Sequence, residues 1–230
     1  MPVNVADVLS RAAYALSDVD ETRWSAQTKL DYFNDGLLEI ATQKPSAFSR
    51  TAELPLDVGT LQTVPEGYAN LIRVVRNLSN AQGATTRVGG RVVTPSSKEV
   101  LNDRFINWHD PDVVPYSKIV MHVMADEFEP RKFYVFPGND GTGLVEAVLA
   151  VIPDTVAGPI TSATTAPIDQ TYFNALHNYV CYRCYGEDMI LNGAPARAQA
   201  HYQMFQGALG IKQMVEGVAN VNTTNIGSTP

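Results

Sequence analysis

Three side chains that can ligate a metal ion recur at helical spacing near residue 180. His177, Cys181 and Cys184 stand at positions i, i+4 and i+7, which an α-helix places within about 60° of one face. His201 falls in the next expected helix and would complete a set of four nitrogen and sulfur ligands of the kind that zinc prefers. One hypothesis is therefore a small zinc-dependent enzyme that uses His177, Cys181 and Cys184.

Core packing is a competing explanation of the same side chains. Phe173, Leu176 and Val180 share this side of the helix, and cysteine is among the residue types most often buried. A second cysteine pair, which most structural zinc sites contain, is missing from the sequence. We therefore predict that Cys181 and Cys184 are reduced and metal-free, and we expect no cofactor.

Two other patterns resemble active-site motifs and are better explained by turns. The glycine cluster Gly138–Gly143 lacks the residue order of a phosphate-binding loop and joins two expected strands, which predicts a hairpin turn. His109 and Asp110 are sequence neighbours, which seldom have the geometry of a base and its carboxylate, and Trp108 and Pro111 beside them indicate a packed turn. We assign no catalytic residue and predict that the protein is not an enzyme.

Composition and charge limit the class of protein. The 230 residues are 45% hydrophobic and 18% charged, with a formal net charge of −7, which is typical of a globular chain. The acidic balance argues against a general nucleic-acid binder, although it permits a protein that nucleic acid slides past. No apolar run has the ~18–20 residues of a membrane span. We expect no export signal, no membrane contact, and synthesis in a reducing cytoplasm.

Hydrophobic periodicity predicts helices at both ends of the chain and strands between them. We expect helices at about 4–17, 24–42, 97–106, 170–191 and 196–218, and strands at about 59–64, 71–75, 118–123, 132–136 and 144–152. Residues 79–97 are mostly polar and glycine-rich, and residues 153–170 are expected to form a linker.

The predicted fold class is α+β. An N-terminal helix pair and a C-terminal antiparallel helix pair form a bundle, and a small, mostly antiparallel β domain is inserted between them. The expected segments are 1–48 for the first helices, 49–153 for the β domain, 154–218 for the linker and second helix pair, and 219–230 for an extended tail.

Two features indicate contacts with a partner chain. Tyr172, Tyr179, Tyr182 and Tyr185 wrap several sides of one helix, and tyrosine suits a contact where one end of the ring stays wet. The polar tail 219–230 has Val221 and Ile226 as apolar anchors, too few to order the segment on its own core. We predict that the tyrosines meet another subunit, and that a partner chain orders the tail through Val221 and Ile226.

A set of motifs in fixed order resembles the head-to-tail connector proteins, or adaptors, that join the portal to the tail in tailed bacteriophages. The set covers residues 4–218. Its pieces are Trp24, Leu30–Ala41, Leu56–Pro65, Leu71–Asn77, Val100–His109, Phe133–Pro137 and Val145–Pro153. The sequence departs from the family pattern at Val64, where leucine is expected before the proline, and loop 79–97 has no clear counterpart.

The resemblance implies a structural virion protein of the phage neck. It implies a homo-oligomeric ring, commonly dodecameric, between the portal protein and a tail nozzle or tail tube protein. DNA would pass through the lumen of this ring without specific binding, which suits an acidic subunit. Another neck or tail-completion protein is the alternative within the structural class. The resemblance leaves open the face that lines the channel and the role of loop 79–97.

Overall fold

The computed structural model describes residues 1–126, 128–188 and 190–219. It divides into two compact units, one formed by Met1–Ala47 with Pro153–Pro230 and the other by Phe48–Ile152. The first unit is mainly helical and the second mainly β-structure, so the α+β class is confirmed.

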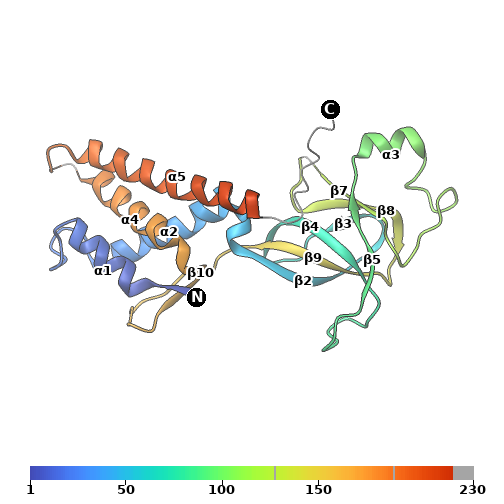
Figure 1. Ribbon diagram of the computed structural model, residues 1–230, viewed down its shortest axis with the longest axis horizontal. Helices are drawn as coiled ribbons and strands as arrows, with labels where there is room; N and C mark the ends of the chain where they lie inside the picture. Colours follow the sequence, from blue (N-terminus) through green and yellow to red (C-terminus); the bar gives the residue numbers. More distant parts are fainter. Residues whose placement is uncertain (127, 189, 220–230) are drawn as a thin grey trace. The chain divides into compact units, whose positions relative to one another are not determined.

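The helical unit contains α1 (Val5–Ala15), α2 (Ala26–Gln43), α4 (Phe173–Glu187) and α5 (Ala194–Ala219). Side chains that accept a backbone N–H fix where the first two helices begin: Asn4 accepts from Asp7, and Ser25 accepts from Thr28. α4 lies against α1, α2 and α5 (Figure 1). A short 3-10 helix, η2 (Gln170–Tyr172), precedes α4, and another, η1 (Pro45–Phe48), follows α2.

The expected linker 153–170 contains a strand that we did not predict. β10 (Thr165–Asp169) pairs antiparallel with β1 (Pro2–Asn4). Ala166 and Ile168 are buried while their neighbours are exposed, which is the alternation of a half-buried strand. Two apolar residues around a proline are too weak a pattern to reveal this strand from sequence.

The β unit consists of two four-stranded sheets. In spatial order the first contains β2 (Ser49–Pro55), β9 (Leu144–Val151), β4 (Tyr68–Leu78) and β5 (Gly89–Val92). The second contains β3 (Val58–Thr63), β8 (Lys132–Asp140), β7 (His122–Ala125) and β6 (Thr94–Pro95). All neighbours are antiparallel except β6 and β7.

One hydrophobic core lies between the two sheets. Val74 and Leu149 from the first sheet pack in the same cluster as Phe133 and Val135 from the second. The unit is therefore a β-sandwich, in which alternate residues of each strand point inward. The side chain of Asn77 also ties β4 to the segment that precedes β7, because its amide donates to the Val120 carbonyl and its oxygen accepts the Val120 N–H.

The prediction of a hairpin turn at Gly138–Gly143 is wrong. β8 pairs with β3 and β7, whereas β9 pairs with β2 and β4, so the connection passes from one sheet to the other. Asn139 is fully buried and holds it in place. Its amide group donates to the carbonyls of Ser117 and Lys118 and accepts from the backbone of Gly141 and Gly143.

A short helix, α3 (Lys98–Arg104), follows β6 and begins where the Ser97 hydroxyl accepts from Val100 N–H, as expected. Its Leu101 belongs to a second, smaller cluster with Trp108, Met124 and Phe136. The strand expected at 118–123 is shifted, since β7 starts only at His122.

Candidate functional site

The structure brings part of the candidate metal cluster together. Cys181 Sγ lies 3.8 Å from His177 Nε2 on α4. The His201 ring, on α5, lies 6.4 Å from the His177 ring between centroids. His201 Nδ1 is engaged at 2.9 Å by the side-chain oxygen of Asn178, so it is already bonded within the chain.

The electrostatics of this cluster favour neutral groups. Burial raises the pKa of both thiols, Cys181 and Cys184, to about 12, whereas zinc binds the thiolate. Burial lowers the pKa of His177, and burial together with the nearby His177 lowers the pKa of His201. Among the described residues, no group of three or more His, Cys, Asp or Glu side chains is placed to hold a metal ion. The arrangement fits helix packing better than zinc chemistry.

Three of the four candidate tyrosines are buried within the chain. Tyr172 packs near Lys44, and the Tyr179 ring lies edge-on to Phe205 with centroids 5.1 Å apart. The Tyr185 hydroxyl donates to the carbonyl of Ala15 at 3.2 Å. These contacts within the chain explain why tyrosines occur on several sides of α4 and at its start.

Tyr182 differs from the other three tyrosines. It is only partly buried, and its ring lies 4.8 Å from the Tyr202 ring between centroids. Of the four, it is the one that is not fully buried. The two apolar anchors of the tail, Val221 and Ile226, lie outside the described residues.

His109 is held by a residue other than its sequence neighbour. Its Nδ1 lies 2.7 Å from the Thr60 hydroxyl, and its ring lies 3.7 Å from the Trp108 ring between centroids. The Asp110 carboxylate instead accepts the backbone N–H of Asp112. The segment is the packed turn that the sequence indicates.

A groove of about 510 Å³ runs along α1 and α2, and its walls are mainly apolar side chains such as Leu9, Ala13 and Leu30. Lys29 also lines it, is almost fully buried, and forms an ion pair with Glu21 at 3.3 Å. Glu21 has a left-handed backbone, with φ of 56°. The groove therefore has mainly apolar walls and one buried cation, Lys29, whose charge is neutralised by Glu21 of the same chain.

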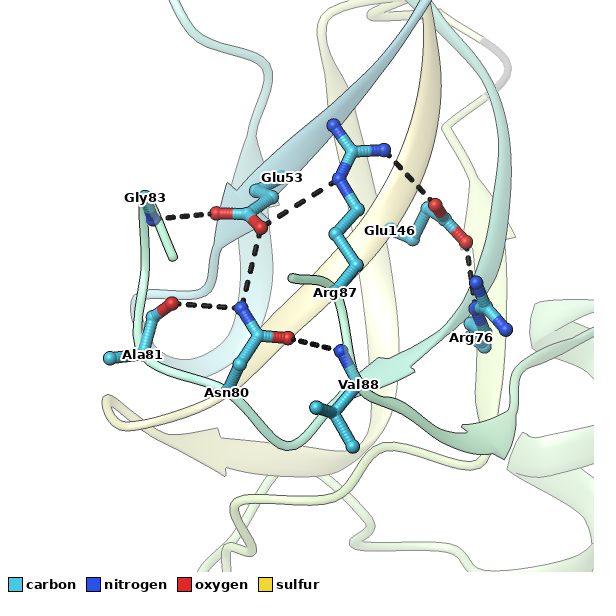
Figure 2. Close-up of polar contacts among 8 residues, drawn as sticks. All are labelled: Glu53, Arg76, Asn80, Ala81, Gly83, Arg87, Val88 and Glu146. Atoms are coloured by element: carbon cyan, nitrogen blue, oxygen red, sulfur yellow. Dashed lines mark hydrogen bonds and ion pairs between the residues drawn. The ribbon is translucent and has the colours of Figure 1, made fainter. Parts of the chain in front are cut away.

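A polar network that we did not predict lies on the first sheet and joins loop 79–88 to strands β2, β9 and β4 (Figure 2). Glu146 of β9 receives Arg76 Nε at 2.7 Å and Arg87 Nη1 at 3.1 Å. Glu53 of β2 lies 3.7 Å from Arg87 Nε and accepts the backbone N–H of Gly83 at 2.7 Å.

Asn80 completes this network within the loop. Its side-chain oxygen accepts Val88 N–H, while its amide donates to the carbonyl of Ala81 and to Glu53. Loop 79–88 is thus fastened across β2 and β9 by charged side chains at several points. In the sequence, Glu53 and Glu146 are far apart, and nothing local shows that they face each other. Their pairing can be recognised only once the register of β2 and β9 is known.

None of the described helices has the length and apolar character needed to cross a membrane. A family model described as SU10 adaptor protein matches residues 3–225. No curated protein matches the sequence.

Proposed function

Since this chain belongs to the SU10 adaptor protein family, we propose that it is the adaptor that joins the portal to the tail of a tailed phage. The family assignment confirms the resemblance described above, and it supports a structural role and a place in the virion. The observation that carries the proposal is the extent of the match, which includes both the helical unit and the β unit.

In this proposal, several copies form a closed ring, commonly of twelve subunits, below the portal and around the DNA channel. The formal net charge of −7 per subunit supports it, because an acidic lumen lets DNA pass without binding. The tail side of the ring binds a nozzle or tube protein. The free protein is monomeric, and the portal acts as the template for the ring.

Segment 219–230 and Tyr182 are the proposed partner contacts. The segment has Val221 and Ile226 as its apolar residues, and an extended chain of this kind gains order by adding its backbone hydrogen bonds to a neighbour. Residues 1–218 should therefore melt at the temperature of the whole chain, yet bind portal more weakly. Full-strength portal binding after truncation would contradict this part of the proposal.

The proposal is tested by mixing the purified protein separately with purified portal and with purified tail protein, then following each mixture by size-exclusion chromatography with light scattering. We expect a stable complex with portal rings. A tight complex with the tail protein together with no affinity for portal would instead favour another neck or tail-completion protein. An unrelated acidic protein of similar size is the control for charge-driven binding.

A further inference from the structure

The groove along α1 and α2 has two features that a ligand would explain. Its walls are mainly apolar, and they include the exposed side chains of Tyr14 and Val19 as well as Ile160 of the segment before β10. Lys29, which is only 1% exposed, also lines it. Within the described part of the chain, the Lys29 Nζ donates no hydrogen bond, although Glu21 lies 3.3 Å away as its counterion. A buried ammonium group with unused donors is unfavourable, so a hydrogen-bond acceptor from outside would stabilise it.

The charges of the groove favour an uncharged occupant. Glu21 already neutralises Lys29, so an anion would compete with this carboxylate for the ammonium group. A neutral group with carbonyl oxygens can instead accept the unused N–H donors while the ion pair stays in place. An extended peptide with apolar side chains offers both carbonyl oxygens for Lys29 and a cover for the apolar walls.

Segment 220–230 of this chain has the composition of such a peptide. It contains no charged side chain, and it combines Val221 and Ile226 with asparagine, threonine and serine. Two apolar residues are too few to order the segment by themselves, whereas a groove that already exists lowers the cost of ordering it. The segment directly follows α5, which belongs to the same helical unit as the groove.

The register of α4 against α5 fixes where this segment starts. The Tyr179 ring lies against Phe205, and the Tyr182 ring lies against Tyr202, so the two helices are antiparallel. Counting from these pairs, α5, which continues to Ala219, runs past the first residue of α4 by about eight residues, or about 12 Å. Segment 220–230 therefore begins beyond the start of α4.

Lys29 lies at the opposite end of the helical unit. Tyr32, three residues after Lys29, donates a hydrogen bond to Glu187, the last residue of α4. The 15 residues of α4 span about 21 Å, so Ala219 and Lys29 are about 30 Å apart along the helix axes. Ile226 follows Ala219 by seven residues, which span at most about 25 Å when fully extended. The segment of the same chain therefore does not bring Ile226 to Lys29, and the occupant comes from another copy.

We infer that the groove binds segment 220–230 of a second copy of this chain. Ile226 packs between α1 and α2 beside Lys29, Val221 covers another part of the apolar wall, and the Lys29 Nζ donates to a backbone carbonyl of the segment. The inference rests on the proposed function in one respect, namely that a ring holds neighbouring copies side by side. Copies held in this way meet each other's segment at about millimolar effective concentration, so a contact that is weak between free chains becomes occupied in the ring.

The test measures binding of a fluorescent peptide of residues 219–230 to the full-length protein by fluorescence anisotropy. We expect saturable binding with a dissociation constant below about 1 mM, the effective concentration available in a ring. A peptide with Val221→Asp/Ile226→Asp should bind at least about tenfold more weakly. Because this change leaves the protein unaltered, its effect does not depend on whether a protein variant folds.

Two protein variants locate the binding site. Ser10 is exposed on α1 and lines the groove, so Ser10→Trp fills the groove and should lower peptide affinity at least about tenfold, with little change in melting temperature. Lys29→Met keeps the length of the side chain but removes its donors, and it should weaken peptide binding about tenfold. Gln43→Trp, at an exposed position at the other end of α2, is the matched control and should bind the peptide like the unaltered protein.

The outcomes separate this inference from the proposed function. No peptide binding at about 1 mM, or equal peptide affinity of Ser10→Trp and Gln43→Trp, would overturn the inference and leave the proposed attachment to portal untouched. A peptide that binds purified portal but not this protein would also overturn it, because the segment would then contact the portal. Peptide binding at the groove by a chain with no affinity for portal would contradict the proposed function alone, since the contact between copies does not require portal.

Discussion

Glu53 and Glu146 lie directly opposite each other on the neighbouring strands β2 and β9, and the Arg87 guanidinium bridges their carboxylates. Like charges at facing positions of an antiparallel pair are destabilising. Arg87 comes from loop 79–88, so this loop provides the counterion that the sheet needs. The loop is therefore part of the β unit's structure rather than a free connection.

Replacing the bridging arginine should loosen the loop. We predict that Arg87→Ala lowers the free energy of unfolding by about 1 kcal/mol, a modest loss because the side chain is more than a third exposed. Exchange of the Gly83 amide proton should become faster, since its acceptor Glu53 loses its counterion. Hydrogen exchange and denaturant unfolding measure the two effects.

Arg73→Ala is the matched control for this prediction. Arg73 lies on β4 like Arg76 and is exposed, so its replacement should leave Gly83 exchange unchanged. Equal effects of the two substitutions would show that the loop does not depend on the Arg87 bridge.

The helices were predictable because their apolar residues repeat along one face. α1 and α2 begin within two residues of the expected positions, and α3 begins within one residue of its expected start. The pairing of Glu53 with Glu146 was not predictable. It depends on which residues of two distant strands face each other, and no local pattern carries that information.

The connection between β8 and β9 shows the same limit. A glycine-rich segment between two strands usually makes a hairpin, but the buried Asn139 ties it to Ser117 and Lys118 instead. These hydrogen bonds reach residues more than twenty positions earlier in the chain, and they hold the connection in the path that takes β9 to the other sheet.

Asn139 should be among the costliest polar residues to replace. Asn139→Ala removes the partners of two backbone carbonyls and two backbone N–H groups, those of Gly141 and Gly143. We predict a loss of about 2–3 kcal/mol or more in the free energy of unfolding. Asn107→Ala, at an exposed position in the same unit, should cost less than about 0.5 kcal/mol. Similar losses for both would contradict the role of Asn139.

The two cysteines should be unreactive in the folded protein. Their burial and raised pKa, about 12 for each, leave almost no thiolate at pH 8. We predict that a thiol reagent modifies Cys181 and Cys184 only after denaturation. Replacing both with alanine should lower the free energy of unfolding by a few kcal/mol at most, through lost packing, and leave assembly intact. Stoichiometric zinc in the purified protein, or assembly lost on chelation, would contradict this prediction.

Acid should destabilise the helical unit through its two facing histidines. Burial lowers the folded-state pKa of His177, and burial with the His177 charge lowers that of His201. The unfolded chain therefore binds protons more readily than the folded chain does. Stability is complete above the unfolded pKa of about 6.5 and falls as pH decreases below it.

His177→Gln/His201→Gln tests this pH dependence. We expect the melting temperature of the unaltered protein to fall between pH 7.5 and 5, and the double variant to lose part of that decrease. His122→Gln, at a histidine of the β unit, is the control and should keep the full pH dependence. A double variant with an unchanged pH profile would show that the two helical histidines are not responsible.

Electron microscopy of the protein mixed with purified portal rings shows directly whether this chain is a portal-to-tail adaptor. We expect an additional closed ring of this protein on one end of the portal, coaxial with its channel, while the protein without portal shows no ring. Portal rings that remain bare at saturating concentrations of correctly folded protein would contradict the assignment as a portal-to-tail adaptor.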